Sequence, residues 1–597
     1  MAMIFGFLLS IASITGYILS AHYWLKIPFR LSPIFTFSSL MIVLFWAALA
    51  HLLQPVSILL FTGGCIFCVV MMVLKIQGHR LISDPFPRDS LFLLTGLIAL
   101  ALACALVGQP SVIDDYAYWA IISKSIATFD ALPITGTSIF ARHLTYTPGL
   151  ALFHYYFFSA FSGFHISVAY FTQNLFLVSL LFALTDRQNK RTSLTLAGGA
   201  VILLVLFSGS VFQKLRVDHF LSLTSAVIIW TQMKNRFSSP RLLVIATAIS
   251  SLYLIKEVGF LLAIFTLLVV LFDLIYMTNV QVKEKRAALC FILLLFIYLI
   301  LQKIAWDNHC ANQGFHQFHS AISFEGIRSA FDFTGNNNSW HGFTIFLKSI
   351  ILGFADRLKI PYLIWYLLLG ALWFKIFKGF SKKEKNRHYR LFSLTIFVFL
   401  LYLAMNYVMQ VLIFGLGTTT QATTSLSRYI NIFLCWFILF TITNSLVNLS
   451  IQTSSKPKWQ TVILVIAALL LAGSSLPHKT KPYEREIKKL TAETGKYIEP
   501  NSQVCISPGR IEDHYLGFRM NYLLFPTRFN VSPFPGQSGQ NNLEQKLSTC
   551  DYLLIYMPDQ NTGPLFSPFT SDRIEHKSLF KVGPAPGQAT LSLQRIF

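Results

Sequence analysis

The stretch PVSILLFTGGCIFCVVMMVLK, residues 55–75, decides the fold class, because no charged side chain interrupts it before Lys75. A helix of about 20 apolar residues is long enough to cross the hydrocarbon core of a membrane. Working outward from this stretch, we find about 14 apolar runs of comparable length, and they predict a polytopic α-helical membrane protein with about 13–14 transmembrane helices. The runs lie at residues 2–22, 32–53, 55–75, 90–108, 166–185, 192–212, 218–233, 241–255, 258–278, 287–305, 360–377, 391–412, 429–448 and 460–476.

The overall composition indicates the same class. The 597-residue chain is 54% hydrophobic and 12% charged, with a mean hydropathy of +0.57. A soluble domain has about a quarter of its residues charged, so a soluble globular protein is excluded. Because the composition becomes polar and mixed after residue 476, we expect two domains. Residues 1–476 form the transmembrane domain, with juxtamembrane helices in the loop 109–165, and residues 477–597 form a soluble domain.

The soluble segment alternates short apolar runs with a polar helical run, separated by Pro and Gly. This pattern predicts a small α/β domain. Residues 484–495 are expected to form a helix, 503–507 and 552–557 strands, and 520–525 a possible third strand.

Cys505 and Cys550 are the only cysteines of this domain. They can form a disulfide if the domain lies in an oxidising compartment. The alternative is that both are small buried hydrophobic residues.

The net charge of +22 marks membrane topology and does not indicate nucleic-acid binding. Residues 477–597 hold 14 of the 48 basic and 11 of the 26 acidic residues, so the excess lies in the membrane part. It concentrates in short loops such as 187–191, 283–286 and 382–387, and loops of this kind mark the cytoplasmic side. The N-terminus and the C-terminal domain then lie outside, and nucleic acid is not expected as a partner. The segments placed outside are 109–165, 213–217, 256–257, 306–359, 413–428 and 477–597.

The ends of the first outside loop have helical character. Apolar and aromatic residues recur at helical spacing over 116–129, which suits a helix lying in the membrane interface. Residues 150–161 form a second apolar run, which the charge count predicts to lie in the interface without spanning. The first run, 2–22, lacks the basic leader of a cleaved signal peptide, so we expect a retained span.

The stretch Asp114–Trp119 opens this loop with two adjacent carboxylates beside the membrane, where such groups are costly. Each polar residue on the outer face also has a simple alternative: Asp218 can cap a helix, and Arg428 can be an anchor reaching the headgroups. Ionisable groups from four separate segments on one membrane face nevertheless favour a shared site. Its candidate members are Asp114, Asp115, Lys124, Arg142, His143, Tyr146, Asp218, Lys256, Glu257 and Arg428, of which Lys256 and Glu257 are alternatively a local charge pair.

Such a site suits an anionic substrate carried by a lipid, such as a polyprenyl phosphate sugar. Arg428, Lys256 or His143 would bind the phosphate and stabilise the charge that builds on the leaving group. Asp114 or Asp115 would take the proton from an acceptor hydroxyl as it attacks the anomeric carbon. The other carboxylate would orient the first or raise its pKa. The sequence does not decide which of the two is the base.

The ordered set of motifs resembles the GT-C superfamily of membrane glycosyltransferases, in the branch of the protein O-mannosyltransferases and lipid A aminoarabinose transferases. Its bacterial members often carry an Asp-Glu or Asp-Asp pair, an aromatic helix containing Lys, and His-x-x-Tyr-Pro-Pro. The matching features here are Asp114-Asp115, Trp119 with Lys124, His143-Leu144-Thr145-Tyr146-Thr147-Pro148, Asp218, Lys256-Glu257 and Ser-x-Arg-Tyr at Arg428, over roughly residues 90–450.

This chain departs from the pattern at three places. Asp115 stands where Glu is common, Thr147 replaces the first Pro, and the junction reads Lys-Glu-Val-Gly where Lys-x-Glu-Gly is common.

The resemblance implies an inverting glycosyltransferase of the bacterial inner membrane. It would move a sugar from an undecaprenyl-phosphate type donor to an extracytoplasmic acceptor such as an envelope glycan, lipopolysaccharide or a protein. It implies no cofactor, because relatives that use monosaccharide phosphates generally need none. Paired carboxylates do attract divalent metal, so a metal stays a minor alternative.

Two other functions fit part of the sequence. A transporter or lipid flippase would line a substrate path with Lys256, Glu257 and Asp218, but would more often show repeats and charges deep in the membrane. An O-antigen ligase or polymerase would use Arg and His of a late outer loop. Such residues are present here as His309, His316, His319 and Arg328, but the early acidic pair has no role in that reading.

Overall fold

The computed structural model describes most of the chain. Its described residues are 2–79, 88–108, 110, 114–134, 144–161, 163–185, 190–208, 212, 214–233, 238–276, 282–315, 323–332, 337–354, 359–378, 382–413, 416, 423–452, 482–499, 502–507, 514–525, 528–530, 540–556, 562–575, 577–584 and 591–596.

The chain divides into two compact units. The first comprises Met1–Gln109 and Thr145–Leu476, and the second comprises Pro110–Leu144 and Pro477–Phe597. Part of the first outside loop therefore belongs to the same unit as the C-terminal segment.

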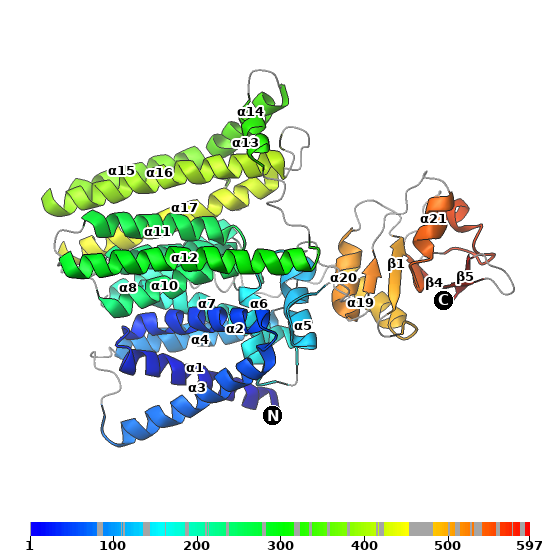
Figure 1. Cartoon of the computed structure of the whole chain (residues 1–597), viewed down its shortest axis with the longest axis horizontal. Coiled ribbons are helices and arrows are strands. Elements are labelled where there is room, and N and C mark those ends of the chain that lie inside the picture. The colour runs from blue at the N-terminus through cyan, green and yellow to red at the C-terminus, as the bar shows by residue number, and fades with distance from the viewer. Residues whose placement is uncertain are drawn as a thin grey trace. The chain divides into compact units, whose positions relative to one another are not determined.

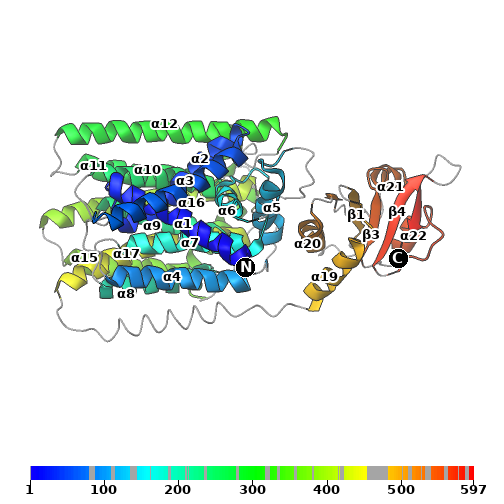
Figure 2. The same cartoon turned by 90° about the horizontal axis from the view of Figure 1, so that it is seen from below.

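The first unit is a bundle of long helices that run roughly parallel to one another (Figures 1 and 2). Thirteen of the 14 predicted runs form helices, which confirms the predicted class of polytopic helical protein, and the run 460–476 lies outside the described residues. The helices are α1 (Ala2–Trp24), α2 (Ser32–Leu49), α3 (Leu53–Ile76), α4 (Arg88–Val107), α7 (Ile166–Leu184), α8 (Lys190–Ser208), α9 (Asp218–Met233), α10 (Ser239–Ile255), α11 (Gly259–Tyr276), α12 (Val282–Asn312), α15 (Tyr362–Lys378), α16 (Lys382–Leu412) and α17 (Thr423–Gln452).

Seven helices among the described residues are long and apolar enough to cross a membrane, and five others contain shorter apolar stretches. The chain is thus a multi-pass membrane protein. A helix that is apolar all round belongs inside a bundle, and α7, which has no charged residue, is buried along nearly its whole length. The helix α9 packs against α7, and α10 and α17 both pack against α9. Short helices η1 (Phe29–Leu31), α13 (Phe324–Ala330) and α14 (Asn337–Leu352) complete this unit.

The second predicted loop helix is α6 (Gly149–Phe158). Ten residues rise only about 15 Å, so α6 is too short to span, as the charge count requires. Every residue of α6 is buried, and α6 packs against α2, α7 and α10. It therefore lies inside the bundle and not on its surface.

The aromatic loop helix belongs to the second unit and has two parts. A π-helical turn, η2 (Asp115–Trp119), leads directly into α5 (Ala120–Phe129), which ends at Asp130 with a left-handed φ of 53°. The predicted helix over 116–129 is confirmed, with a wider first turn. Single π-helical turns are frequent at functional sites.

The C-terminal segment folds as an α/β domain around a five-stranded sheet, which confirms its predicted class. The strand order is β2-β1-β3-β4-β5. The strands β2, β1 and β3 are parallel, and β4 and β5 extend the sheet in antiparallel pairing. The strands are β1 (Gln503–Ser507), β2 (Arg528–Asn530), β3 (Tyr552–Ile555), β4 (Ser578–Pro584) and β5 (Leu591–Arg595).

Helices cover both faces of this sheet. Successive strand residues point to opposite sides, so each face has its own apolar side chains against which helices pack. Val504 and Ile506 face one side with residues of α19 (Pro482–Thr494) and α20 (His514–Leu524). Cys505 faces the other side with residues of α21 (Gln540–Leu547) and α22 (Thr562–Phe566). The helix predicted over 484–495 is α19, and the first predicted strand matches β1.

The predicted strand over 520–525 is wrong, because residues 520–524 belong to the helix α20 and Phe525 follows its last residue. Leu516 and Met520 are fully buried, and Leu524 packs against the same core. Spacing by four residues places these three side chains on one helical face, whereas alternate residues would share the face of a strand.

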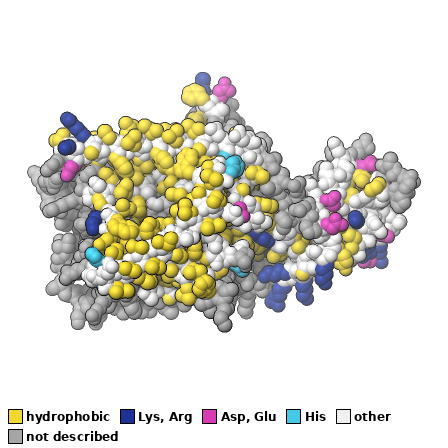
Figure 3. Space-filling view, turned by 60° about the horizontal axis from the view of Figure 1, so that its bottom comes forward, with side chains coloured by type: hydrophobic (Ala, Val, Ile, Leu, Met, Phe, Trp, Pro, Cys, Tyr) yellow, Lys and Arg dark blue, Asp and Glu magenta, His cyan; other side chains and the backbone are white. Residues whose placement is uncertain are grey.

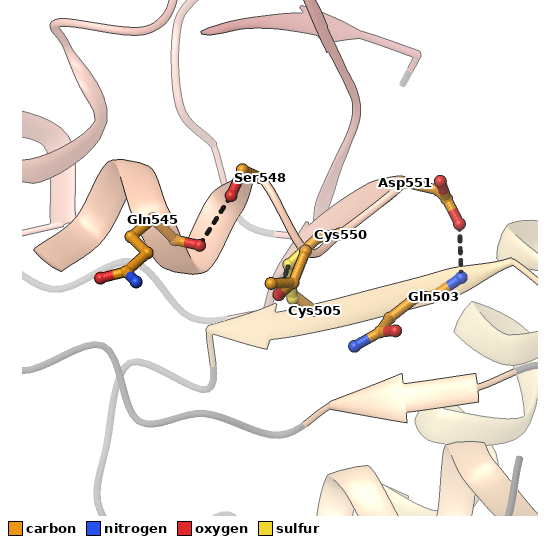
Figure 4. Close-up of a disulfide and its surroundings, with 7 residues drawn as sticks. Gln503, Cys505, Gln545, Ser548, Cys550 and Asp551 are labelled. Atoms are coloured by element: carbon orange, nitrogen blue, oxygen red, sulfur yellow. Dashed lines mark hydrogen bonds between the residues drawn. A yellow bond between two sulfur atoms is a disulfide. The ribbon is translucent and has the colours of Figure 1, made fainter. Parts of the chain in front are cut away.

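Cys505 and Cys550 form a disulfide with a Cα–Cα distance of 5.8 Å (Figure 4). Cys505 lies in β1, and Cys550 lies just before β3, its neighbour in the sheet. The adjacent Asp551 accepts a 2.7 Å hydrogen bond from the backbone N–H of Gln503. The two strands are therefore joined at this end by a covalent bond and a side-chain contact.

Candidate functional site

Three predicted residues meet in the first unit around the carboxylate of Asp218. The Lys256 Nζ lies 2.7 Å from Asp218 Oδ1. The Arg428 Nη2 and Nε donate to Asp218 Oδ2 at 2.8 and 3.1 Å. Two cations thus share one carboxylate, and the cluster carries a net positive charge. We call Asp218, Lys256 and Arg428 the ionic cluster.

The chain brings these residues together from three elements. Asp218 is the first residue of α9, where the helix dipole favours a negative charge. Arg428 lies near the start of α17. Lys256 follows α10 in an extended conformation, with φ −164° and ψ 150°. The ends of three packed helices therefore converge at one point.

A tight turn presents Lys256 between α10 and α11. The Gly259 N–H donates to the Lys256 carbonyl at 2.7 Å. A Cβ at Gly259 would lie 1.9 Å from the Leu252 carbonyl oxygen, so only glycine allows this close approach. The glycine of the Lys-Glu-Val-Gly junction thus fixes the turn that positions the lysine.

Exposure differs strongly within the ionic cluster. The Lys256 side chain is 5% exposed, Asp218 14% and Arg428 32%. Arg428 is therefore the member most accessible to a ligand. Lys256 is surrounded by aromatic rings, with its Nζ 5.6 Å from the Tyr146 ring centroid and 5.5 Å from that of Tyr429. Both distances lie within the range of cation–π attraction.

The segment that carries Tyr146 is anchored on both sides. Trp306 Nε1 donates to the Thr145 carbonyl at 2.8 Å, and Thr147 Oγ1 donates to the Tyr253 carbonyl at 2.7 Å. A side chain at Gly149 would collide with the Leu254 carbonyl. The predicted tyrosine is thereby held close to α10 and α12, next to Lys256.

Glu257 lies in a different environment from its neighbour Lys256. Its charge acts on Tyr253 and Cys310, as does that of Asp307. Asp307 pairs with Lys303 at 2.5 Å, one helical turn away on α12. Lys256 therefore belongs to the ionic cluster, whereas Glu257 acts on the same two side chains as Asp307.

Two neighbours of the ionic cluster were not among the predicted site residues. Tyr429 follows Arg428 directly, and the Ser-x-Arg-Tyr motif contained the signal for it. His219 follows Asp218, is 2% exposed, and its Nε2 has no hydrogen-bond partner within the described structure. A histidine next to an acid at a helix start was the available signal, but nothing in the sequence indicated its burial.

Asp114 and Asp115 lie in the second unit, where the π-helical turn begins. Asp115 is 0% exposed, and Asp114 is partly buried. The following Tyr116 donates its hydroxyl to the Pro110 carbonyl at 2.6 Å and packs edge-on against Tyr522 at 5.5 Å. The Arg519 guanidinium lies 5.2 Å from the Tyr116 ring. Burial, together with the charges of Tyr116 and Asp115, raises the pKa of Tyr522.

Lys124 binds within the second unit. Its Nζ donates to the Tyr522 carbonyl at 2.7 Å and lies 5.1 and 5.7 Å from the Tyr522 and Phe525 rings. Burial lowers the pKa of Lys124 to about 8. Lys124 therefore joins α5 to α20, a contact that the sequence did not predict.

The remaining predicted residues lie at other positions in the structure or are not described. Arg142 and His143 lie outside the described residues, as do His316 and His319. His309 stacks on Trp306 with ring centroids 5.3 Å apart, and Arg328 is exposed on α13. Within the described ranges, no group of three or more His, Cys, Asp or Glu side chains could hold a metal ion.

An apolar cavity of about 240 Å³ lies between α15, α16 and α17. On α17, its lining residues Phe433 and Phe437 are five and nine positions after Arg428. At about 100° per residue, they lie on the side of the helix away from Arg428. The cavity is thus distinct from the ionic cluster.

Comparison with known proteins gives one solved structure to report. The chain is similar in fold to the crystal structure of ArnT from Cupriavidus metallidurans in the apo state, with a TM-score of 0.48 and 11% sequence identity. The match covers 81% of this chain and 95% of that chain. No family model matches the sequence, and no curated protein matches it.

Proposed function

We propose that this protein is an inverting glycosyltransferase that takes a sugar from a polyprenyl phosphate and gives it to an extracytoplasmic acceptor. The observation that carries the proposal is the ionic cluster. Two cations around one carboxylate, at the convergent ends of α9, α10 and α17 in a membrane bundle, suit a phosphate held on a lipid chain. The resemblance of the sequence motifs to GT-C enzymes supports the same chemistry.

Arg428 would bind the phosphate directly, because it is the most exposed of the three and has a forked guanidinium. Lys256 would contribute its charge from a nearly buried position. Asp218 holds both cations in place, so they need not reorganise when negative charge builds on the departing phosphate. Tyr146 would line the phosphate site beside Lys256. The other residues predicted to bind substrate stay predictions: Lys124, Arg142, His143 and Glu257.

In the proposed reaction, an acceptor hydroxyl attacks the anomeric carbon from the side opposite the phosphate. The new C–O bond forms as the bond from the carbon to the phosphate oxygen breaks, which inverts the anomeric centre. Asp114 or Asp115 takes the hydroxyl proton. The polyprenyl phosphate leaves with the electron pair, and no oxidant or metal is required.

We also propose that the ionic cluster and the C-terminal domain lie on the extracytoplasmic face of a bacterial inner membrane. The basic loops 187–191, 283–286 and 382–387 support this orientation. The Cys505–Cys550 disulfide agrees with it, because disulfides persist in oxidising compartments.

The test is transfer by purified protein from a radiolabelled polyprenyl phosphate sugar to an envelope extract. Asp114→Asn and Asp115→Asn each change a carboxylate into an amide of the same shape. The variant that lacks the base should lose about 10²–10⁴-fold in kcat, with donor binding preserved. Full activity in both single variants and in the double variant would refute the carboxylate base.

Arg428→Ala provides a second arm, because it should weaken donor binding rather than abolish the proton transfer. A matched control is Arg286→Ala, which removes an exposed arginine of α12 in the basic loop 283–286. Mass spectrometry of envelope glycans and lipid A in a deletion strain would identify the sugar and the acceptor. Activity that persists in EDTA would agree with the expected lack of a metal.

A transporter or flippase is the second candidate, and it predicts a different result. Proteoliposomes would then move the lipid-linked sugar across the bilayer without any acceptor, and the Asp114→Asn variant would still do so. Sugar transfer that depends on an acceptor and on the carboxylates would exclude a transporter or flippase.

A further inference from the structure

We propose that one face of α19 binds the headgroups of anionic phospholipids and so docks the C-terminal domain on the membrane surface. This inference is independent of the sugar-transfer proposal. Figure 3 shows Lys and Arg side chains gathered in a row over the part of the molecule where α19 lies. The residues that make up this row are Arg485, Lys488, Lys489 and Lys496, all of which are exposed.

The helical geometry separates this basic face from the buried face. At about 100° per residue, Arg485, Lys488 and Lys489 lie within one third of the helix circumference, and the following turn adds Lys496. The opposite side carries Ile487 and Leu490, which are 1% exposed and belong to the core against the sheet. The orientation of the basic face is therefore fixed by the packing of α19.

Acidic residues are kept off the centre of this face. By the same spacing, Glu486 and Glu493 fall on one flank of the helix and Glu484 on the other, each roughly 90° from the centre of the basic face. Glu486 is paired with Lys577 of the domain at 2.7 Å, so its charge is already compensated. Ala492, the remaining residue on the basic face, is small and exposed. The basic face thus carries four basic side chains.

Its position in the chain explains why the partner would be a membrane. The apolar run 460–476 ends only nine residues before Arg485. The sequence predicts this run to be a membrane span. Nine extended residues reach at most about 30 Å, so α19 would stay close to the predicted end of that span. Lipid headgroups are the most concentrated anions within that reach, and lysine and arginine near an anionic bilayer are attracted to it.

The experiment measures lysine accessibility in the full-length protein. The chain is placed in nanodiscs of phosphatidylcholine alone or of phosphatidylcholine with phosphatidylglycerol, and its lysines are acetylated with a water-soluble active ester. Mass spectrometry then gives the labelling rate at each position. Lys489 and Lys496 should label several-fold more slowly with phosphatidylglycerol, and high salt should remove the difference. Lys581, exposed on β4, is the internal control and should not change.

A pair of variants makes the test specific to the basic face. Arg485→Glu with Lys489→Glu should abolish the lipid dependence at Lys488 and Lys496, whereas Lys581→Glu should leave it intact. All three positions are exposed, so the fold should survive, and the labelling pattern of the other lysines reports this directly.

Three results would overturn the proposal. The first is equal labelling of α19 in both lipids, and the second is an equal fall at Lys581. The third is slow labelling in phosphatidylcholine after addition of soluble glycerol phosphate, which would point to a small anionic ligand and not to a lipid surface.

Discussion

At the scale of single residues, the ionic cluster combines rigidity with charge. Lys256 is almost buried, and its ammonium depends on Asp218 and on two aromatic rings. Breaking a buried pair by removing one partner leaves an uncompensated charge, which costs more than the pair itself contributes. The cluster should therefore respond very differently to single and to paired substitutions.

Asp218→Asn should be destabilising by about 3–5 kcal/mol, because Lys256 loses its counter-charge in a place with little water. The double variant Asp218→Asn with Lys256→Met should recover part of this loss, because no buried charge remains. The measurement is thermal unfolding in detergent, followed by a double-mutant cycle. Additive effects of the two changes would contradict the pairing.

His219 lies in the same region but was not expected there. The sequence correctly placed Asp218 at the start of a helix, because the change from a polar to an apolar pattern marks the beginning of α9. It gave no sign that the next side chain would be buried. Burial depends on which helices pack around α9, and no local pattern encodes this.

At the scale of elements, the existence and type of the long helices follow from the sequence, because thirteen apolar runs coincide with helices. The boundaries do not follow as closely, since α12, α16 and α17 extend several residues beyond the predicted runs 287–305, 391–412 and 429–448. The short elements were less predictable. Residues 520–525 contain enough apolar residues for either a strand or a helix. The buried Leu516, four residues before Met520, shares one face with it, which is the spacing of a helix. The strands β2, β4 and β5 were not predicted, since β2 has three residues and the other two lie at the antiparallel edge of the sheet.

The contact between α5 and α20 leads to a prediction about pH. Burial lowers the pKa of Lys124 from 10.5 to about 8. Below pH 8, the lysine is charged in both the folded and the unfolded state, and the folded state bears the cost of burying it. Between the two values, only the unfolded chain keeps the proton, so the free energy of unfolding should rise with pH.

Lys124→Met keeps the length of the side chain and removes its charge. The wild type should gain thermal stability between pH 8 and about pH 10, and the variant should lack this part of the gain. Differential scanning fluorimetry of both proteins over this range measures the difference. Parallel curves for the two proteins would show that Lys124 is not responsible.

The disulfide between the neighbouring strands β1 and β3 leads to another prediction at this scale. It closes a sequence separation of 45 residues, and a crosslink of that length stabilises by on the order of 4 kcal/mol through the unfolded state. Cys505→Ala with Cys550→Ala should therefore make the C-terminal domain sensitive to protease at lower urea. Adding reductant to the wild type should give the same result, and it should have no effect on the variant.

At the scale of the whole molecule, composition and the pattern of apolar runs were sufficient to predict a polytopic membrane protein. The small α/β domain was also anticipated, from its composition and turn residues. The sequence could not show that residues 110–144 join the same compact unit as 477–597. These segments are more than three hundred positions apart, and contacts such as Lys124 with Tyr522 come from tertiary packing.

The long helix α12 has a further consequence for the molecule as a whole. Its charged residues Arg286 and Lys303 bracket an apolar section that rises about 25 Å, and Leu293, Leu294, Ile297 and Leu301 on it are exposed. The length of this apolar section is fixed, so it matches the hydrocarbon core of a bilayer of only one thickness. In a bilayer of a different thickness, the helix must tilt or the lipid must deform.

Lys303 and Asp307, at the end of this section, act electrostatically on Cys310, and so does Glu257, the direct neighbour of Lys256. A change in bilayer thickness should therefore shift the depth of the ionic cluster relative to the headgroups. Transfer measured in nanodiscs of short-, medium- and long-chain lipids should pass through a maximum, and a rate independent of chain length would contradict this. The protein would then be tuned to the thickness of one particular membrane.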